Sequence, residues 1–552
     1  MSESLIGFFG PDCQEIEPVP DTFPPEVEEG NIEYKRQLVN ISVTRLEHLI
    51  SQMKWRLQEG GGEAIYEIGV TDTGMLKGLN ADDLEESLNS LHKMADRLGA
   101  TVTVVREREL ENHRKVVEVL VRKVPDSHDF IDVRISVLGS WGSGKSTLVG
   151  VLTDGQLDNA DGRARLNLFR HVHEIESGRT SSVSQEIFGF DDKGNVLNYA
   201  EKPNIEDILN LASKIITLID QPGHDKYLKT TMCALTSQQP DYAILAVSCT
   251  TGITNTSREH LGLALALKLP TAVVLTKSDA VGKQQLEKLI KCLEKTLKSP
   301  GIKKVPFRVV NEDDAIMAAS SINGNVCPYF VASSVSGRGL NLLTKFLYAV
   351  PSVFGKNKEI DGSVEHQVDS VYDLAHCGTV VAGTLVKGVI KEQEELYIGP
   401  DSSGNFFPVK VQSIHRSRVP TLIAMAGQAV ALALGNVPLT VRKGMVLLKN
   451  PFPICCMAFD ADIRVLFHHG KGLTKNFQCV VHINNVCQTA IIEECNKACV
   501  PTNSRAVVRF RFLKRPEFIS VGSRLLFREG RTKGTGDVLK IYPYQNDPDL
   551  MR

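Results

Sequence analysis

One short segment combines glycines, a lysine and a hydroxyl side chain in the spacing that proteins use to bind phosphate. Residues 139–146 read Gly-Ser-Trp-Gly-Ser-Gly-Lys-Ser, which matches the pattern GxxxxGK followed by Ser or Thr. An apolar run precedes the segment and a helical pattern follows it. In such a loop, backbone N–H groups surround the phosphates, Lys145 reaches the β- and γ-phosphates, and the hydroxyl of Ser146 ligates Mg²⁺. The segment therefore predicts a phosphate-binding loop that works with Mg²⁺.

Two further motifs follow apolar runs that are typical of buried strands. Asp220-Gln-Pro-Gly223 has the form DxxG, in which the carboxylate holds Mg²⁺ through water and the glycine amide senses the γ-phosphate. Thr276-Lys-Ser-Asp279 ends another apolar run. The carboxylate of Asp279 can accept both N–H donors of guanine, a donor pair that adenine lacks. The motifs therefore indicate GTP as the nucleotide and disfavour an ATP-dependent kinase or transporter.

A fourth segment, at residues 333–337, also follows a strand-like run and is placed to cap the guanine O6 atom with backbone amides. The four motifs occur in the order that a GTP site requires. The residues that we expect to bind GTP or GDP are Gly139, Ser140, Trp141, Gly142, Ser143, Gly144, Lys145, Ser146, Thr147, Asp220, Gly223, Thr276, Lys277, Asp279, Ser333, Ser334 and Val335.

The elements that must position these motifs form an α/β domain. Strands alternate with helices from residue 131 to 354, which is typical of a doubly wound, mostly parallel sheet. After residue 360 the pattern changes to short strands separated by turns, which predicts two β-barrel domains at 360–450 and 454–545.

A smaller α/β sandwich is predicted at residues 31–126, where two helical patterns at 44–58 and 80–98 alternate with strand patterns. Asn80 is the expected N-cap of the second helix. No chemistry is visible in this module. Residues 1–30 carry acids and prolines but no Lys or Arg, so we expect a disordered acidic arm there.

Composition limits the classes of function. The 552 residues carry 63 Lys and Arg against 65 Asp and Glu, so any contact with RNA must come from local patches. We expect neither a secretory signal nor a membrane-spanning run, and we expect a cytoplasmic monomer with no membrane or DNA partner. Twelve cysteines form no CxxC pair. The densest group fits neither a zinc ribbon nor a finger, and we expect reduced thiols at Cys479, Cys487, Cys495 and Cys499.

The motifs resemble those of the translational GTPases, because a histidine, His224, directly follows the DxxG segment. Residues 377–390 and 427–432 are similar to the second-domain barrel of elongation factors, and residues 527–536 to their third-domain barrel. With the N-terminal module included, the chain most resembles the GTP-binding protein 1 and 2 family of elongation-factor-like GTPases. The resemblance implies a GTPase of eukaryotic cytoplasm that acts on the ribosome with tRNA or a tRNA-mimicking protein.

The resemblance also implies roles for single residues. His224 and Lys145 are the expected catalytic residues, with His224 orienting the attacking water when the ribosome repositions it. The polar segment that ends at Thr180 resembles an extended switch I, so Ser146, Thr180 and Asp220 are the expected metal ligands. A surface histidine without a catalytic role remains the alternative for His224, and a GTP-dependent scaffold that binds proteins away from the ribosome remains the alternative function.

Several residues depart from the elongation-factor pattern or allow two interpretations. Gly142 stands where elongation factors usually have Asp, Thr276 replaces the common Asn, and Trp141 either covers the pocket or packs against it. His171, His173, Glu174 and Glu176 are expected to be solvated rather than metal ligands. Two basic stretches, at residues 415–418 and 509–515, either contact RNA phosphates or belong to ordinary strands.

Overall fold

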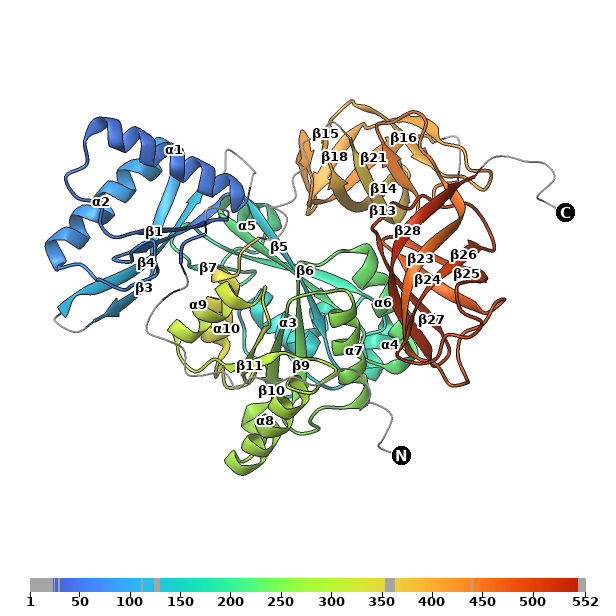
Figure 1. Cartoon of the computed structure of the whole chain (residues 1–552), viewed down its shortest axis with the longest axis horizontal. Coiled ribbons are helices and arrows are strands. Elements are labelled where there is room, and N and C mark those ends of the chain that lie inside the picture. The colour runs from blue at the N-terminus through green and yellow to red at the C-terminus, as the bar shows by residue number, and fades with distance from the viewer. Residues whose placement is uncertain are drawn as a thin grey trace.

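The computed structural model describes residues 23, 25–27, 30–110, 113–123, 130–352, 363–437 and 440–544. Figure 1 shows an α/β domain at the centre, with a small α/β module on one side and two all-β domains on the other. The predicted arm at residues 1–30 falls mostly outside the described residues. Its described part is bound to the module, since the backbone N–H groups of Phe23 and Glu26 donate to Gly74 and Asp72.

The N-terminal module is a four-stranded sheet covered by two helices (Figure 1). The side chain of Asn80 accepts a hydrogen bond from Asp83 and caps the second helix as predicted. Met53 and Met94 are fully buried between the helices and the sheet. Both predicted helices are therefore confirmed, and a short edge strand that the sequence did not reveal completes the sheet. The elements, with sheet order β1-β2-β4-β3, are β1 (Ile32–Lys35), α1 (Val43–Glu59), β2 (Glu63–Ile68), α2 (Ala81–Arg97), β3 (Ala100–Glu109) and β4 (Lys115–Lys123).

The central domain contains an eight-stranded sheet whose order is β11-β12-β10-β9-β5-β8-β6-β7. Neighbours from β11 to β8 pair in parallel, whereas β6 and β7 continue the sheet in antiparallel pairs. The strands are β5 (Ile131–Leu138), β6 (Ser184–Phe190), β7 (Val196–Leu197), β8 (Lys214–Asp220), β9 (Tyr242–Ser248), β10 (Thr271–Thr276), β11 (Val305–Arg308) and β12 (Val326–Val331).

Helices lie on both faces of this sheet, as a doubly wound fold requires. The central strands are buried on both faces, which explains their nearly continuous apolar sequences. The helices are α3 (Lys145–Asp154), α4 (Val172–Ser177), α5 (Ile205–Leu211), α6 (Leu228–Ser237), α7 (Asn255–Ala266), α8 (Lys283–Leu297), α9 (Glu312–Ser321) and α10 (Leu340–Ala349). Three 3-10 turns are η2 (Arg163–Leu168), η3 (Asp225–Tyr227) and η4 (Ser278–Ala280).

The second domain is an antiparallel eight-stranded sheet of order β17-β16-β22-β13-β14-β21-β18-β19, with a separate β15-β20 ribbon. Its strands curl around a core of Val, Leu and Ile. The elements are β13 (Glu365–Leu374), β14 (Gly378–Lys387), β15 (Val389–Lys391), β16 (Glu395–Gly399), β17 (Phe407–Lys410), β18 (Ser413–Arg416), β19 (Val419–Thr421), β20 (Ile423–Met425), β21 (Ala429–Gly435) and β22 (Val446–Leu448).

The third domain is a closed six-stranded barrel of order β23-β26-β25-β24-β27-β28. Inward-facing residues alternate with outward-facing ones along its strands, so Phe459, Phe510 and Phe512 fill the interior. The elements are β23 (Cys456–Phe467), β24 (Gln478–Ile483), β25 (Val486–Cys495), β26 (Arg505–Phe512), β27 (Arg524–Glu529) and β28 (Thr532–Pro543). Within the described ranges, no helix combines the length and apolar character needed to cross a bilayer.

Buried charges join the N-terminal module to the central domain. The carboxylate of Glu63 accepts from Arg122 at 2.7 Å, and the ammonium group of Lys214, from β8, lies 3.8 Å from the same oxygen. Lys214 also donates to the carbonyl of Tyr348 at 2.8 Å. Because all three charged side chains are almost wholly buried, separating the two units would leave charges without partners, which is costly.

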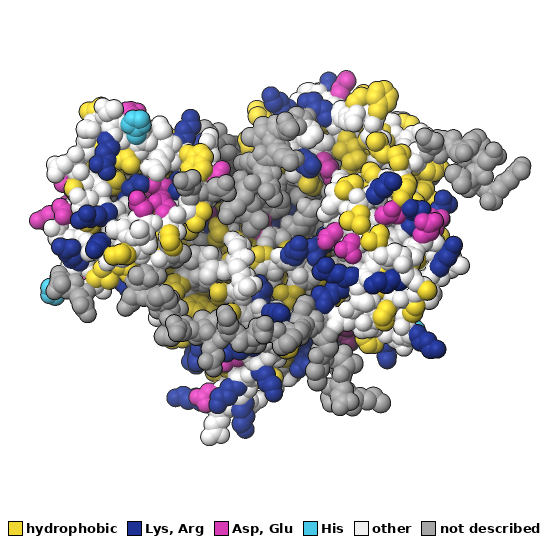
Figure 2. All heavy atoms as spheres, in the orientation of Figure 1, with side chains coloured by type: hydrophobic (Ala, Val, Ile, Leu, Met, Phe, Trp, Pro, Cys, Tyr) yellow, Lys and Arg dark blue, Asp and Glu magenta, His cyan; other side chains and the backbone are white. Residues whose placement is uncertain are grey.

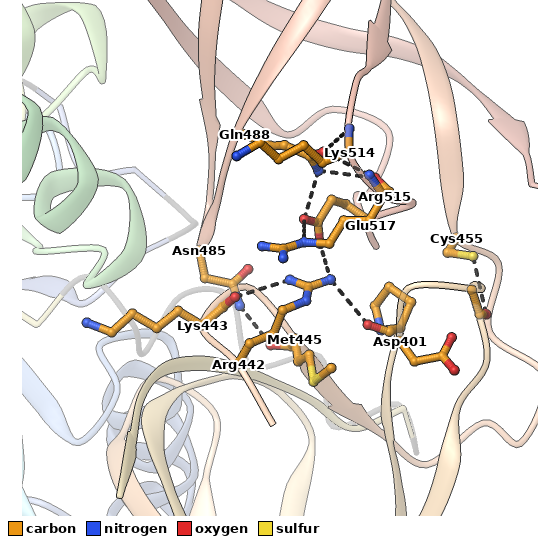
Figure 3. A network of polar contacts seen from close by, with 12 residues as sticks. Asp401, Arg442, Lys443, Met445, Cys455, Asn485, Gln488, Lys514, Arg515 and Glu517 are labelled. Atoms are coloured by element: carbon orange, nitrogen blue, oxygen red, sulfur yellow. Dashed lines mark hydrogen bonds and ion pairs between the residues drawn. The ribbon is translucent and has the colours of Figure 1, made fainter. Parts of the chain in front are cut away.

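A second polar network joins the two all-β domains (Figure 3). Arg442, from the second domain, donates to the buried carboxylate of Glu517 in the third domain at 2.9 Å. Glu517 also accepts from Gln488 and Arg515. In the opposite direction, Asn485 of the third domain donates to the carbonyl of Met445 in the second domain at 2.8 Å. The two domains are therefore held together by charge-assisted hydrogen bonds as well as by apolar contact.

We predict that Arg442→Met destabilises the pair of all-β domains. The substitution keeps an apolar stem but removes the cation, so a 2% exposed Glu517 carboxylate keeps only its other partners. We expect a loss on the order of 2 kcal/mol, read as a lower midpoint of urea unfolding. The control is Lys449→Met, which removes a surface ion pair with Glu394 in the same domain. Equal midpoints for the two variants would contradict the role of Arg442.

Candidate functional site

The four sequence motifs meet at one edge of the central sheet. The phosphate-binding loop follows β5, Asp220 ends β8, Thr276 ends β10 and Ser333 follows β12. These strands run parallel, so their carboxyl ends lie at the same edge. The arrangement explains how segments almost 200 residues apart in the sequence can form one nucleotide site.

The phosphate-binding loop turns sharply because two of its glycines, Gly142 and Gly144, have positive φ angles of 75° and 81°. Gly139 is required for a different reason, since a Cβ atom there would lie 2.3 Å from the carbonyl oxygen of Ala246. The N–H of Gly139 donates to Nδ1 of His260 at 3.1 Å. His260 is fully buried on α7, and burial with the nearby Lys145 charge lowers its pKa to about 3. A neutral imidazole on α7 therefore accepts a hydrogen bond from the loop. No sequence motif indicated this contact.

The remaining loop residues surround the start of α3. The Lys145 ammonium group donates to the carbonyl of Ser140 at 3.0 Å, and burial lowers its pKa to about 8. Ser143 is buried, whereas Thr147, in the first turn of α3, is half-buried. A phosphate group at this loop would replace the carbonyl as the partner of Lys145 and would favour the charged form of the lysine.

Three oxygen side chains converge beside the loop. The hydroxyl of Ser146 donates to Oδ2 of Asp220 at 2.5 Å and lies 2.9 Å from the hydroxyl of Thr180. The second oxygen, Oδ1 of Asp220, is buried and has no hydrogen-bond partner among the described residues. Burial raises the pKa of Asp220 to about 6, against the opposing effects of Lys145 and Ser146. Hydroxyl and carboxylate oxygens suit Mg²⁺, so the residues present fit this metal.

Thr180 is held in place by a glutamate that the sequence analysis placed in solvent. Glu174 is fully buried. Its Oε1 atom accepts from the backbone and the hydroxyl of both Ser181 and Ser182, at 2.6–3.0 Å, while Oε2 accepts from the N–H groups of Arg170 and His171. The expectation of a solvated Glu174 is therefore wrong, because its carboxylate organises the whole segment 170–182, which we call switch I.

The electrostatics of Glu174 agree with this role. Burial raises the pKa of the carboxyl group, but the hydrogen bonds from Ser181, Ser182 and Arg170 outweigh burial and bring the pKa down to about 2. His171, His173 and Glu176 are exposed, as expected. Glu174 also accepts the N–H of His171, the N-cap of α4, but with His rather than Ser or Thr at that position the sequence carries no capping-box signature.

Trp141 connects the phosphate-binding loop to switch I. Its side chain is 52% exposed, so it does not pack into the core. The guanidinium of Arg179 lies 4.8 Å from the centre of the indole ring, within the range of a cation–π interaction. Of the two interpretations that the sequence left open, the structure favours Trp141 as part of a cover over the loop.

The DxxG segment lies against the same loop. A Cβ atom at Gly223 would lie 2.2 Å from the Lys145 ammonium and 2.8 Å from the carbonyl of Gly139, so only glycine fits there. His224 is half-buried, and its Nδ1 accepts from the N–H of Lys226 at 3.1 Å, which caps η3. His224 therefore directly follows a residue that lies against the phosphate-binding loop, and its imidazole is engaged in a local turn.

The guanine motifs are braced against the phosphate-binding loop. The hydroxyl of Thr276 donates to the carbonyl of Ser143 at 2.6 Å, so a hydroxyl supplies a contact between the two motifs although the usual amide is missing. Lys277 has a φ of 57° and turns the chain so that Asp279 is exposed to a ligand. The hydroxyl of Ser333 accepts from the N–H of Val335 at 3.3 Å, and the carbonyl of Ser334 accepts from Asp158.

Three arginines of the two basic stretches have partners within the chain. Arg416 is buried, with its guanidinium 3.6 Å from the centre of the Phe130 ring. Arg509 pairs with Asp460 and Glu494, and Arg511 pairs with Glu493. Ion pairs and ring contacts therefore satisfy these three arginines, which favours ordinary strand packing for them, while Arg418 and Lys514 are exposed.

A different basic surface, not noticed in the sequence, lies on α8. Figure 2 shows Lys and Arg side chains gathered on the lower projection of the molecule, where Figure 1 places this helix. Five exposed lysines on or just beyond the helix form the surface, which we call the α8 patch: Lys283, Lys288, Lys291, Lys295 and Lys298. The spacing of these lysines on the polar face of an amphipathic helix was the signal that sequence analysis could have used.

Two family models match parts of the chain. The model of the elongation factor Tu GTP-binding domain matches residues 132–354, and that of elongation factor Tu domain 2 matches residues 378–448. Human GTP-binding protein 2 is 51% identical over 534 residues, which is 95% of this chain and 88% of the human protein. GTP-binding protein 1 of Xenopus laevis is 42% identical over 518 residues, covering 92% of this chain and 78% of the frog protein.

A solved structure gives the same fold at lower identity. The translation elongation factor SelB of Methanococcus maripaludis, in complex with the GTP analogue GppNHp, aligns with a TM-score of 0.55 at 20% identity. The alignment covers 76% of this chain and 81% of SelB. Together with the closed third barrel, these matches confirm the predicted fold class.

We predict that Glu174→Gln weakens binding of GTP with Mg²⁺ while binding of GDP stays near its original affinity. The amide replaces one acceptor oxygen by a donor, so switch I loses charge-assisted hydrogen bonds that keep Thr180 in place. We expect a roughly tenfold loss for GTP, measured by titration of a fluorescent nucleotide, because about one such bond is lost in net terms. The control is Glu176→Gln, an exposed neighbour on α4. An unchanged preference between GTP and GDP in Glu174→Gln would refute the role of Glu174.

Proposed function

Because the chain belongs to the GTP-binding protein 1 and 2 family, a group of GTPases built like elongation factors, we propose that it acts on the ribosome as a GTP-driven switch. The chain is a GTPase, which converts GTP to GDP and phosphate.

We assign the nucleotide contacts from the geometry of the site. The backbone of residues 139–147 and the side chain of Lys145 surround the phosphates. Asp279 accepts the guanine N–H donors, while the backbone at 333–335 faces the base oxygen. Ser146, Thr180 and Asp220 would hold Mg²⁺, which neutralises charge on the phosphate oxygens when it is bound. The unpartnered oxygen of Asp220 supports this set of ligands.

His224 is the residue that we propose to orient the attacking water. It follows Gly223, which lies against Lys145 and Gly139 of the phosphate-binding loop. Its Nδ1 atom accepts a hydrogen bond from the backbone of Lys226, so the ring must leave this turn before it can reach a water at the γ-phosphate. A partner that remodels η3 would supply that movement, and intrinsic hydrolysis would stay slow without it.

The positions of the other domains would depend on whether GTP or GDP is bound. We propose that residues 31–126, 131–354, 360–450 and 454–545 each form a unit around its own core, since the apolar clusters of the described residues divide nearly along these limits. Helix α6 begins directly after the DxxG segment and contacts the third barrel, so movement of the segment would be transmitted to the barrel. The partners that we propose are ribosomal RNA and tRNA or a tRNA-mimicking protein, met by a cytoplasmic monomer.

The α8 patch supports contact with ribosomal RNA. All five lysines are exposed. Lysines gathered in this way attract phosphate backbones and make binding sensitive to salt. The main support for the proposed function comes from the nucleotide site and not from this patch. Ser146, Thr180 and Asp220 converge within hydrogen-bond distance, and His224 stands four residues beyond Asp220.

The test is the rate of GTP hydrolysis with and without eukaryotic ribosomes. We expect ribosomes to stimulate the rate by roughly 100-fold or more, because positioning a water by a side chain contributes about this much. His224→Ala should lose the stimulation and keep its affinity for GTP. His92→Ala, which removes an exposed histidine on α2, should behave like the unaltered protein. A rate that ribosomes leave unchanged would contradict the proposal and favour a GTP-dependent scaffold.

A further inference from the structure

Three side chains that can bind a metal converge where the central domain meets the third domain. Cys233 lies on α6, His482 on β24 and Cys487 on β25. One ligand atom from each residue lies within 4.8 Å of those of the other two. The sequence predicts only a reduced thiol at Cys487, within a group of third-domain cysteines. In the structure, its neighbours in this cluster are His482 of the same domain and Cys233 of the central domain.

The β24–β25 hairpin fixes two of the three side chains. His482 and Cys487 are directly paired across the two strands, so their side chains project from the same face of the hairpin. At the turn, Asn485 donates to the carbonyl of Met445 in the second domain at 2.8 Å. The hairpin is therefore anchored on one side by the second domain, while its His482 and Cys487 face α6.

The local chemistry favours a bound cation. His482 is 1% exposed, and its Nδ1 atom has no hydrogen-bond partner in the described part of the chain. A buried imidazole nitrogen without a partner is costly, and a metal or its water would satisfy the imidazole.

We propose that Cys233, His482 and Cys487 form a zinc site that joins helix α6 to the third domain. Two thiolates and an imidazole are a ligand set typical of Zn²⁺, with water in the fourth position. On binding, each thiol loses its proton to solvent as its sulfur bonds to the metal, so two protons are released per zinc when both thiols start protonated.

The spacing of the three ligand atoms is close to that of a formed site. With Zn–S bonds of about 2.3 Å and Zn–N bonds of about 2.0 Å, neighbouring ligand atoms in a tetrahedron lie about 3.6–3.8 Å apart. The present separations of up to 4.8 Å must therefore shrink by about 1.2 Å at most. Side-chain rotation at the two cysteines can supply that change without moving either domain.

The site lies on the helix that follows the DxxG segment, so zinc bound there would affect the nucleotide switch. Helix α6 starts at Leu228, immediately after the segment that contains Gly223 and His224. Zinc bound here would fix α6 against the barrel. Because two linked equilibria affect each other equally, any nucleotide state that moves α6 would change the affinity for zinc, and zinc would change the affinity for that nucleotide by the same factor.

The test uses the full chain, freed of metal by a chelator and kept reduced. We expect it to bind one Zn²⁺ per chain, and Co²⁺ in its place to give the charge-transfer absorption of a cobalt–thiolate bond. Cys233→Ser and Cys487→Ser should each weaken zinc binding by at least roughly 100-fold and abolish the cobalt–thiolate band of the site. The control, Cys495→Ser, changes another cysteine of β25 that lies outside the cluster and should bind like the unaltered protein.

Two outcomes would overturn the proposal. Equal zinc binding by all variants would place the metal elsewhere. Absence of zinc binding, with a Cys233–Cys487 disulfide found by mass spectrometry without reductant, would identify a redox pair instead. Binding of GDP by Cys233→Ser and Cys487→Ser, measured in parallel, shows that the variants are folded, so loss of zinc in a folded variant reports on the site itself.

Discussion

The hydroxyl group of Ser146 is the point on which the site depends. It donates to Asp220 and lies beside Thr180, so one atom joins the phosphate-binding loop, the end of strand β8 and switch I. None of these segments is close to another in the sequence. The arrangement persists because Glu174 holds switch I from within, and because the buried His260 supports Gly139 behind the loop. A ligand that replaces this contact changes three segments at once.

The same contact links nucleotide chemistry to the rest of the molecule. Asp220 leads through Gly223 and His224 into α6, which lies against the third barrel. The third barrel is in turn tied to the second domain by Arg442 and Glu517 (Figure 3). Because the two all-β domains are joined by buried polar contacts, they would respond to α6 as one body. A local change at the phosphates can thus become a movement of domains.

Much of this could be predicted from the sequence, and the reasons for the successes and failures are physical. Lys145 and Asp220 belong to motifs whose chemistry allows few substitutes, and buried parallel strands have a recognisable apolar pattern. Glu174 was misjudged because its partners are mostly backbone N–H groups, which have no sequence signature. Cys233 and Cys487 were not associated because about 250 residues separate them and only the packing of two domains unites them. Arg416 seemed a surface cation until a ring and a carbonyl were found beside it.

The most direct test of the account is hydrogen–deuterium exchange of switch I in the two nucleotide states. With Mg²⁺ and a non-hydrolysable GTP analogue, the amides of Ser181 and Ser182, which donate to Glu174, should exchange slowly. With Mg²⁺ and GDP they should exchange much faster, while amides of the third barrel stay equally protected in both states. Identical exchange of switch I in the two states would contradict the proposal that switch I, joined to the Mg²⁺ ligands through Thr180, responds to the nucleotide.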